Sequence, residues 1–283
     1  MTTDPSRRER RDGWAAKRSI RINIERDPTI CYALGRSKLL PTRDIALLAF
    51  GSRETARDRL RKLHCAGYVR AHVRDLAADN LYTLTERGRA LAVEHLDADP
   101  DELVVVRTLP KQLEHLLGVN RMRVCLTVAS RALPHDPLRA FVPDWELQRG
   151  RHAALVGLVP DAVARLRDER GANRFVAIEV DTGTENPSYV AKKLVTYEQH
   201  IRAGLPIHGA PIERVVLVAP GHRRLRSVAR AIVAAGVRVP VHLGDLAIVT
   251  PSNVLRGYAS PTRLAADGAG DATALFVERL LSS

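Results

Sequence analysis

The segment Leu158–His200, LVPDAVARLRDERGANRFVAIEVDTGTENPSYVAKKLVTYEQH, carries most of the information about the fold of this chain. It places Asp161 on one apolar run and both Glu179 and Asp181 at the end of a second. Lys193 lies on the helical segment that follows. Strand-end acids with a lysine nearby are what a divalent-metal phosphodiesterase site requires, because carboxylates hold a hard cation and the lysine steadies the water or the phosphate. The alternative is a set of ordinary strand-end acids beside a solvated helix.

The composition indicates a polyanionic partner. The chain has 283 residues, of which 45% are hydrophobic, and this length accommodates two compact domains better than one. The 44 Lys and Arg residues against 32 Asp and Glu residues give a net charge of +12. Nucleic acid is therefore the expected partner, with an anionic membrane surface as the rival. No apolar run is long enough to cross a membrane, and no helix pairs a basic face with a bulky aromatic one, so we expect no membrane partner.

The cysteines lack the spacing of a metal site. Cys31, Cys65 and Cys125 are isolated, so we expect neither zinc nor a disulfide, and we predict each as a small buried apolar residue. Residues 1–26 are arginine-rich and too polar for a signal peptide. They predict either a flexible basic arm that lies along phosphates or a solubilising tail. The expected location is the reducing cytoplasm.

Residues 27–97 have the element order of a winged helix-turn-helix domain. The predicted elements are helices at 29–39, 43–50, 53–66 and 86–95 and strands at 68–73 and 81–85. Thr42, Ser52 and Thr85 are the expected N-caps. Three helices followed by a two-stranded wing is the winged-helix order, in which the third helix enters the major groove of DNA.

The third predicted helix carries arginines at a spacing that suits DNA recognition. Arg53, Arg57 and Arg61 recur every four residues and form one stripe, while Arg59 and Lys62 lie on a second. Acidic residues lie between them, and a carboxylate can accept from cytosine while an arginine forks onto guanine. The same mixture suits a solvated helix with internal ion pairs, and winged helices also bind proteins. The expected DNA contacts are Arg53, Arg57, Arg61, Lys62, Arg70 and Arg74, the last two on the wing.

A second domain is expected after an acidic, proline-containing linker at Asp97–Asp101. Its element order, α-β-β-β-α-β-α-β, predicts a mixed sheet flanked by helices over residues 102–250. Residues 251–283 are predicted as a loop followed by a short C-terminal helix at 272–281. The other predicted elements are helices at 111–133, 188–203 and 223–235 and strands at 141–147, 155–167, 174–180, 215–218 and 237–243.

This order, with Asp161 on the second strand and Glu179 on the third, resembles the PD-(D/E)xK restriction-endonuclease-like fold. The resemblance implies that these two acids hold magnesium and that a lysine two residues after the glutamate orients the attacking water. Asp181 stands at that position, so either it adds a metal ligand or a lysine from the next helix reaches the site. Helical geometry favours Lys193, at the edge of the buried stripe, over Lys192, which points towards solvent.

A closer resemblance covers most of the chain. It rests on HLLGVNRMRVCL at His115–Leu126, Trp145-Glu146, Pro160-Asp161, EVDTGTE at Glu179–Glu185 and KLVTY at Lys193–Tyr197. In their order and spacing, these motifs resemble the replication-relaxation family, found largely on plasmids and other mobile elements of bacteria. The resemblance implies an N-terminal winged helix, a nuclease-like C-terminal domain and an association with plasmid replication, relaxation and transfer.

Other chemistries lack the residues that they need. A rolling-circle relaxase requires a His-x-His metal pair, which is not present, so Tyr197 is predicted as a packing residue and not as a nucleophile. No phosphate loop is present, and no nucleotide cofactor is expected. Glu114 and Glu146 are weaker metal candidates. The basic residues around Arg224 are expected either to grip phosphate near a helix start or only to coat it with charge.

Three functions remain open. The leading one is a DNA-binding protein of a mobile element with little or no enzymatic activity, whose winged helix reads double-stranded DNA, for example as a homodimer on a palindrome. Its second domain would hold DNA or a replication or transfer protein. The second is a magnesium-dependent endonuclease that uses Asp161, Glu179, Asp181 and Lys193, with the three acids as metal ligands. The third is an autoregulatory repressor or antitoxin-like protein whose second domain grips a protein partner.

Overall fold

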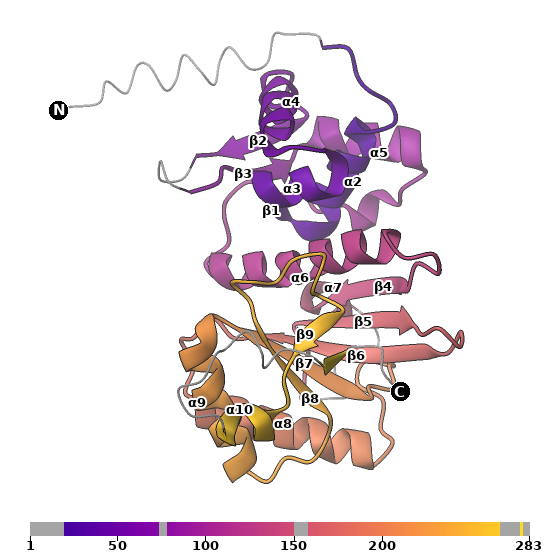
Figure 1. Cartoon of the computed structure of the whole chain (residues 1–283). Helices are drawn as coiled ribbons and strands as arrows, with labels where there is room; N and C mark the ends of the chain where they lie inside the picture. Colours follow the sequence, from indigo (N-terminus) through magenta and orange to yellow (C-terminus); the bar gives the residue numbers. More distant parts are fainter. Residues whose placement is uncertain (1–19, 74–77, 150–157, 267–277, 280–283) are drawn as a thin grey trace, which may run out of the picture. The chain divides into compact units, whose positions relative to one another are not determined.

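The chain divides into two compact units, each built from helices and strands. The computed structural model describes residues 20–73, 78–149, 158–266 and 278–279. The first unit is Met1–Leu113 and the second is Glu114–Ser283 (Figure 1). In the described part of the chain, no helix is long and apolar enough to cross a membrane.

The first unit combines a small sheet with helices. Its elements are α2 (Asp27–Ser37), β1 (Leu39–Pro41), α3 (Thr42–Ala49), α4 (Arg53–Cys65), β2 (Val69–His72), β3 (Leu81–Leu84), α5 (Glu86–Leu96) and the 3-10 turn η1 (Pro100–Glu102). The three-stranded sheet is antiparallel and has the order β1-β3-β2. The predicted helices and hairpin are therefore present. Strand β1 was not predicted, because three residues are too few to show an alternating pattern.

Two of the three predicted helix caps are confirmed. The side chains of Ser52 and Thr85 each accept a hydrogen bond from a backbone N–H in the first turn of the following helix, at 3.1 Å. The prediction for Thr42 was wrong, since Thr42 is the first residue of α3. Its backbone N–H and its hydroxyl both donate to the carbonyl of Asn80, at 3.1 and 3.3 Å. Thr42 therefore fastens α3 to the residue that precedes β3.

The apolar face of α4 is buried as predicted, with Ala56, Leu60 and Leu63 in the core of the first unit. The predicted linker at 97–101 lies within this unit. Just beyond it, Leu103 is buried against Gly35 of α2, where a side chain in place of the glycine would collide with it. This contact holds the chain against the first unit after the last residue of α5.

The second unit is a mixed five-stranded sheet with helices on both faces. Its elements are α6 (Leu113–Arg131), β4 (Leu138–Pro143), α7 (Asp144–Leu147), β5 (Ala162–Arg167), β6 (Asn173–Val180), α8 (Pro187–Arg202), β7 (Arg214–Ala219), α9 (Gly221–Ala234), β8 (Val241–Asp245), β9 (Arg256–Tyr258), α10 (Pro261–Ala266) and β10 (Glu278–Arg279). The strand order is β4-β5-β6-β7-β8. Pairs β4–β5 and β5–β6 are antiparallel, whereas β6–β7 and β7–β8 are parallel.

Alternation along the strands explains the two layers of helices. On β6, Val176, Ile178 and Val180 belong to the core that contains the buried face of α6. Ala177 belongs to the opposite core, which contains the buried faces of α8 and α9. Successive side chains of a strand point to opposite faces of the sheet, so one short apolar run is able to support both layers.

Several predicted boundaries were wrong. The run at 141–147 ends as a strand at Pro143, where the helix α7 begins. The second and last strands begin later than predicted, at Ala162 and Val241, because apolar residues such as Val159 and Val239 precede them outside the strands; residues 155–157 of the predicted second strand lie outside the described residues. The loop expected from residue 251 onward contains β9 and α10. Of the helix expected at 272–281, only Glu278–Arg279 are described, and they pair with β9 as a strand; the rest lies outside the described residues.

The cysteines follow the prediction in two of three cases. Cys31 and Cys125 are buried, whereas Cys65 is partly exposed, and all three are free thiols. Cys125 lies on α6 with its sulfur 3.8 Å from the carbonyl of Val249. Arg121 donates to the same carbonyl at 3.1 and 2.8 Å, so α6 anchors the loop that follows β8.

Candidate functional site

The two acids singled out in the sequence meet at one edge of the five-stranded sheet. Ala162 pairs with Ile178 across β5 and β6, so Asp161 and Glu179 lie at the adjoining position, where β5 begins and β6 ends. The carboxylate of Asp161 accepts a hydrogen bond from the backbone N–H of Val180 at 2.7 Å. Antiparallel pairing therefore places side chains that are 18 positions apart in sequence next to each other.

Helix α8 adds a lysine and a tyrosine to these acids. The Nζ of Lys193 donates to Oε2 of Glu179 at 2.5 Å, and the hydroxyl of Tyr197 donates to Oε1 of the same carboxylate. The two residues are four apart on a helix and share one face. Lys192 is exposed, as predicted. The geometry thus selects Lys193 as the lysine that reaches the acids.

Helix α6 adds a histidine. His115 Nε2 lies 3.0 Å from Oδ2 of Asp161. His115, Asp161, Glu179, Lys193 and Tyr197 together form what we call the acid cluster. No sequence pattern pointed to a role for His115, although this residue opens the HLLGVNRMRVCL motif. Tyr197 was predicted as a packing residue; its side chain is fully buried, and its hydroxyl also donates a hydrogen bond to Glu179.

Burial and charge shift the pKa of the acids in opposite directions. Burial, followed by the charge of Asp161, raises the pKa of Glu179 to about 8. Burial alone would also raise the pKa of Asp161, but its hydrogen bond with His115 and the charge of Lys193 outweigh burial and lower it. One of the two neighbouring acids therefore ionises readily, and the other retains a proton more tightly.

The same two carboxylates, Asp161 and Glu179, also shift the pKa values of the other side chains in the cluster. The hydrogen bond to Asp161 is the largest influence on His115 and raises its pKa. Burial by itself would lower the pKa of Lys193, but the charges of Glu179 and Asp161 outweigh it and raise the pKa. Burial, with the neighbouring Glu179, raises the pKa of Tyr197 well above its ordinary value. The lysine is therefore an ammonium at neutral pH.

Asp181 is engaged elsewhere. Its Oδ2 accepts a hydrogen bond from Nε of Arg224 on α9 at 2.6 Å, and its Oδ1 accepts from the backbone N–H of Gly183 at 2.7 Å. Arg224 also donates to the carbonyl of Glu185 at 2.6 Å. This arginine therefore binds the loop after β6, and Asp181 is part of that attachment.

Few side chains at this sheet edge are placed to bind a metal ion. Among the residues that the structure describes, no three His, Cys, Asp or Glu side chains gather closely enough to hold a metal. Asp161 and Glu179 are two neighbouring carboxylates, and Mg²⁺ is usually bound by one or two carboxylates with water and substrate phosphate completing the shell. Glu114 is exposed at the start of α6 and Glu146 is half-buried on α7. Of the predicted metal acids, the structure brings together Asp161 and Glu179.

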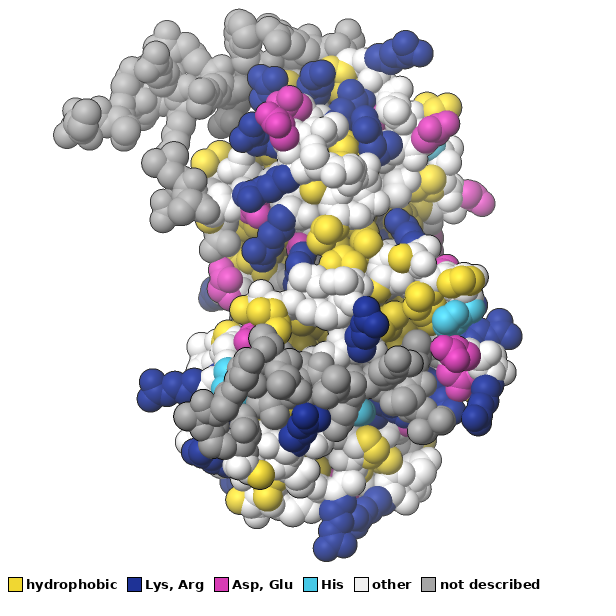
Figure 2. All heavy atoms as spheres, in the orientation of Figure 1, with side chains coloured by type: hydrophobic (Ala, Val, Ile, Leu, Met, Phe, Trp, Pro, Cys, Tyr) yellow, Lys and Arg dark blue, Asp and Glu magenta, His cyan; other side chains and the backbone are white. Residues whose placement is uncertain are grey.

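The predicted DNA contacts on α4 lie on its exposed face. Arg53, Arg57, Arg61 and Lys62 are all exposed, and we call the first three the arginine stripe. Arg61 pairs only loosely with Asp58, at 4.0 Å. Figure 2 shows Lys and Arg side chains gathered over the first unit on the face in view.

Arg59 differs from its neighbours on α4. It donates from Nε to Asp27 at 3.0 Å and makes a second ion pair with the same carboxylate, which is fully buried. Spacing placed Arg59 on the second stripe, but spacing does not reveal the acid on another helix that holds it. On the wing, Arg70 is exposed and donates to the carbonyl of Arg107 at 3.0 Å. Arg74 lies outside the described residues.

Comparison with protein families identifies the class of this mixed α+β chain. A family model described as replication-relaxation matches residues 32–209. The match covers more than half of the chain, and the protein belongs to the replication-relaxation family, as its motifs predicted. Searches of curated proteins and of solved structures gave no match. The matched region includes both the arginine stripe and the acid cluster. Membership favours a role in the replication or relaxation of a plasmid or other mobile element.

Proposed function

We propose that this protein binds double-stranded DNA of a plasmid or other mobile element, in the cytoplasm, and acts in its replication, relaxation or transfer. The first unit would act as a winged helix-turn-helix domain, with α4 as the recognition helix and β2 and β3 as the wing. Membership of the replication-relaxation family supports a role on a plasmid or other mobile element, and the net charge of +12 supports DNA as the partner.

The arginine stripe is the observation that carries this proposal. Its three guanidinium groups are exposed along one side of a helix whose other side is buried in the core. Side chains four apart on a helix rise by about 6 Å. Such a row would follow a groove or its flanking phosphates, and each phosphate contact releases condensed counterions. A homodimer on a palindromic site would place two such helices in successive major grooves.

We propose that the second unit is a PD-(D/E)xK-like domain that holds DNA or a partner protein without cutting DNA. Lys193 is bonded to Glu179, Arg224 is bonded to Asp181, and His115 pairs with Asp161. Each of the three acids thus has a resident basic partner. A site arranged in this way has less need of a divalent cation to offset its negative charge.

A second candidate function is a magnesium-dependent DNA endonuclease. The convergence of Asp161, Glu179 and Lys193 favours it, because the lysine missing from position 181 is supplied by α8. The two acids are a donor set that suits Mg²⁺, which would act as a Lewis acid towards the scissile phosphate. Asp161 would contribute an ionised carboxylate, and Lys193 would contribute an ammonium that orients water. In this case, the ion pair between Lys193 and Glu179 would have to open for the site to work.

Binding is tested by electrophoretic shift and fluorescence anisotropy of the full chain on a duplex from the host element's origin region, across a salt series. We expect binding that weakens steeply as salt rises, because counterion release drives it. Binding that does not depend on salt, or no binding, contradicts the proposal.

Cleavage is tested by incubating supercoiled plasmid with the protein and Mg²⁺ or Mn²⁺. We expect no nicking above the level of the Asp161→Ala variant. Nicking by the wild type that is lost in both Asp161→Ala and Lys193→Ala establishes the endonuclease instead. Nicking that persists in both variants identifies a contaminant.

A further inference from the structure

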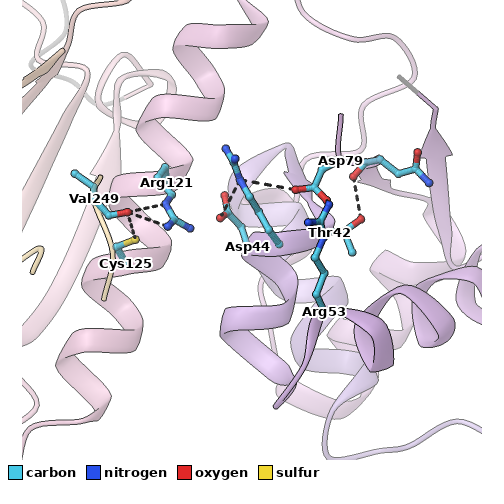
Figure 3. A network of polar contacts seen from close by, with 9 residues as sticks. Thr42, Asp44, Arg53, Asp79, Arg121, Cys125 and Val249 are labelled. Carbon is cyan, nitrogen blue, oxygen red and sulfur yellow. Dashed lines mark hydrogen bonds and ion pairs between the residues drawn. The ribbon is translucent and has the colours of Figure 1, made fainter. Parts of the chain in front are cut away.

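Asp79 contacts the start of the proposed recognition helix from the wing. Its Oδ1 accepts a hydrogen bond from Nη2 of Arg53 at 2.5 Å, and its Oδ2 lies 3.9 Å from Nε of Arg43 on α3 (Figure 3). The side chain of Asp79 is only 12% exposed, whereas those of Arg53 and Arg43 are 65% and 58% exposed. The carboxylate is therefore mostly covered, while both guanidinium groups remain open to a ligand.

The position of Asp79 is fixed by its neighbour in the sequence. The carbonyl of Asn80 accepts two hydrogen bonds from Thr42, the first residue of α3 (Figure 3). Leu81 follows at once as the first residue of β3 and is fully buried. The backbone next to Asp79 is therefore held on both the helix side and the sheet side, and its carboxylate is a firm point of attachment for Arg53.

A held arginine differs from a free one as a DNA contact. A guanidinium group has five N–H donors in a rigid fork, and Asp79 engages one nitrogen of Arg53. Arginine has large side-chain rotamer entropy, part of which is lost before DNA arrives if the side chain is already oriented. Arg61 of the same stripe lies 4.0 Å from Asp58, and both side chains are more than half exposed. That pair holds its arginine far more weakly.

We infer that Asp79 is a positioning residue that orients Arg53 to read a guanine edge in the major groove. This inference rests on the proposed DNA-binding function. Bidentate recognition of guanine O6 and N7 requires the fork to be presented in one orientation, and a carboxylate on its far side supplies that constraint. A phosphate presents equivalent oxygens in several directions and therefore constrains the fork less than the fixed O6 and N7 pair does.

The charge of Asp79 has a second consequence. A carboxylate beside the DNA surface repels phosphate, so it weakens binding to any duplex that offers Arg53 no guanine in return. Asp79 therefore increases the difference in affinity between the preferred site and other DNA from both directions: it strengthens the specific contact and weakens the non-specific one.

The experiment selects sites from a randomised duplex library with the full-length protein, and then measures affinity for the selected duplex and for a scrambled duplex. We expect wild type to enrich a site containing a strongly preferred guanine. In Asp79→Ala, the preference for that guanine should fall by about tenfold, with affinity for scrambled DNA unchanged or higher. Arg53→Lys should lose the same preference, because it keeps the charge but not the fork.

Asp58→Ala is the matched control, since it removes an exposed acid from the same helix, and it should keep the wild-type preference. Circular dichroism melting checks that each variant is folded, and Asp79→Asn, which keeps the size and an acceptor oxygen, should show an intermediate preference. The inference is overturned if Asp79→Ala keeps the wild-type preference at every position, or if wild type binds DNA without any preference. If wild type binds no duplex at all, the proposed function itself fails.

Discussion

The exposed face of α4 in the first unit and the sheet edge of the second unit treat charged side chains in opposite ways. On α4, the arginine stripe stands in solvent: Arg53 is bonded to Asp79 but remains 65% exposed, and Arg61 has only a loosely placed acid nearby. At the sheet edge of the second unit, Glu179 and Asp181 are buried, and each is bonded to a basic side chain from a neighbouring helix. The first arrangement leaves positive charge available to an external polyanion. The second uses its charges to attach helices to the sheet.

The difference has an energetic basis. An exposed guanidinium group keeps its hydration and exchanges it for phosphate at little cost. A buried carboxylate loses its hydration and requires a nearby cation or a proton, and Glu179 has both a bonded lysine and a pKa raised to about 8 by burial and by Asp161. The role expected for a charged side chain therefore depends on whether another group of the chain already neutralises or binds it. Three experiments test this.

The largest effect is expected at Arg59, the arginine of α4 that pairs with a fully buried acid. Arg59→Ala leaves Asp27 buried without its partner and should lower the free energy of unfolding of the first unit by about 3–5 kcal/mol. The exposed Arg57→Ala should change it by no more than about 0.5 kcal/mol. Urea unfolding followed by circular dichroism measures both. Equal losses in the two variants would mean that exposure does not separate structural from binding arginines.

A smaller effect is expected from Glu179→Gln, as a change in pH dependence. The pKa of Glu179 is raised from 4.5 to about 8 in the folded protein by burial and by Asp161, so the folded chain keeps a proton that the unfolded chain loses. Wild-type stability should therefore fall as pH rises from about 4.5 to about 8, and the glutamine variant should lose this part of the slope.

Trp145 of α7 provides the measurement, in a Trp14→Phe background, since the chain has two tryptophans. Urea unfolding of the second unit is followed by its fluorescence at several pH values. Glu169→Gln, which replaces an exposed acid, is the control and should keep the wild-type slope. An unchanged slope in Glu179→Gln would show that this carboxylate is not the one that titrates.

The smallest effect is expected when Lys193 is removed. Lys193→Ala deletes the ammonium that is bonded to Glu179 and leaves the cluster one charge more negative. Affinity for Mn²⁺, measured by isothermal titration calorimetry, should rise by about tenfold, a change of about 1.4 kcal/mol. Lys192→Ala, the exposed neighbour, should leave it unchanged. Weaker Mn²⁺ binding in Lys193→Ala would mean that the lysine assists the metal and would favour the endonuclease.

Sequence patterns predicted the order of most elements because burial on one face dictates their periodicity. The apolar side of α4 and the position of Lys193 at the edge of the buried stripe of α8 follow from helical spacing alone. Spacing could not show that Arg59 meets Asp27 or that Arg224 meets Asp181, since these pairs join separate elements. The same limit concealed His115. The short strand β1 and the strand β9 were missed because three residues carry too little periodicity.

The salt dependence of DNA binding tests the central claim most directly. The slope of log affinity against log salt is measured for wild type, for Arg53→Ala/Arg57→Ala/Arg61→Ala, and for a control triple of exposed arginines in the second unit, Arg139→Ala/Arg165→Ala/Arg230→Ala. We predict that the slope becomes shallower by about two in the stripe variant, since Arg57 and Arg61 would each neutralise a phosphate that adds about 0.9 to the slope while Arg53 reads a base, and that it changes little in the control. Equal slopes in wild type and the stripe variant would contradict the assignment of α4 as the DNA-binding surface.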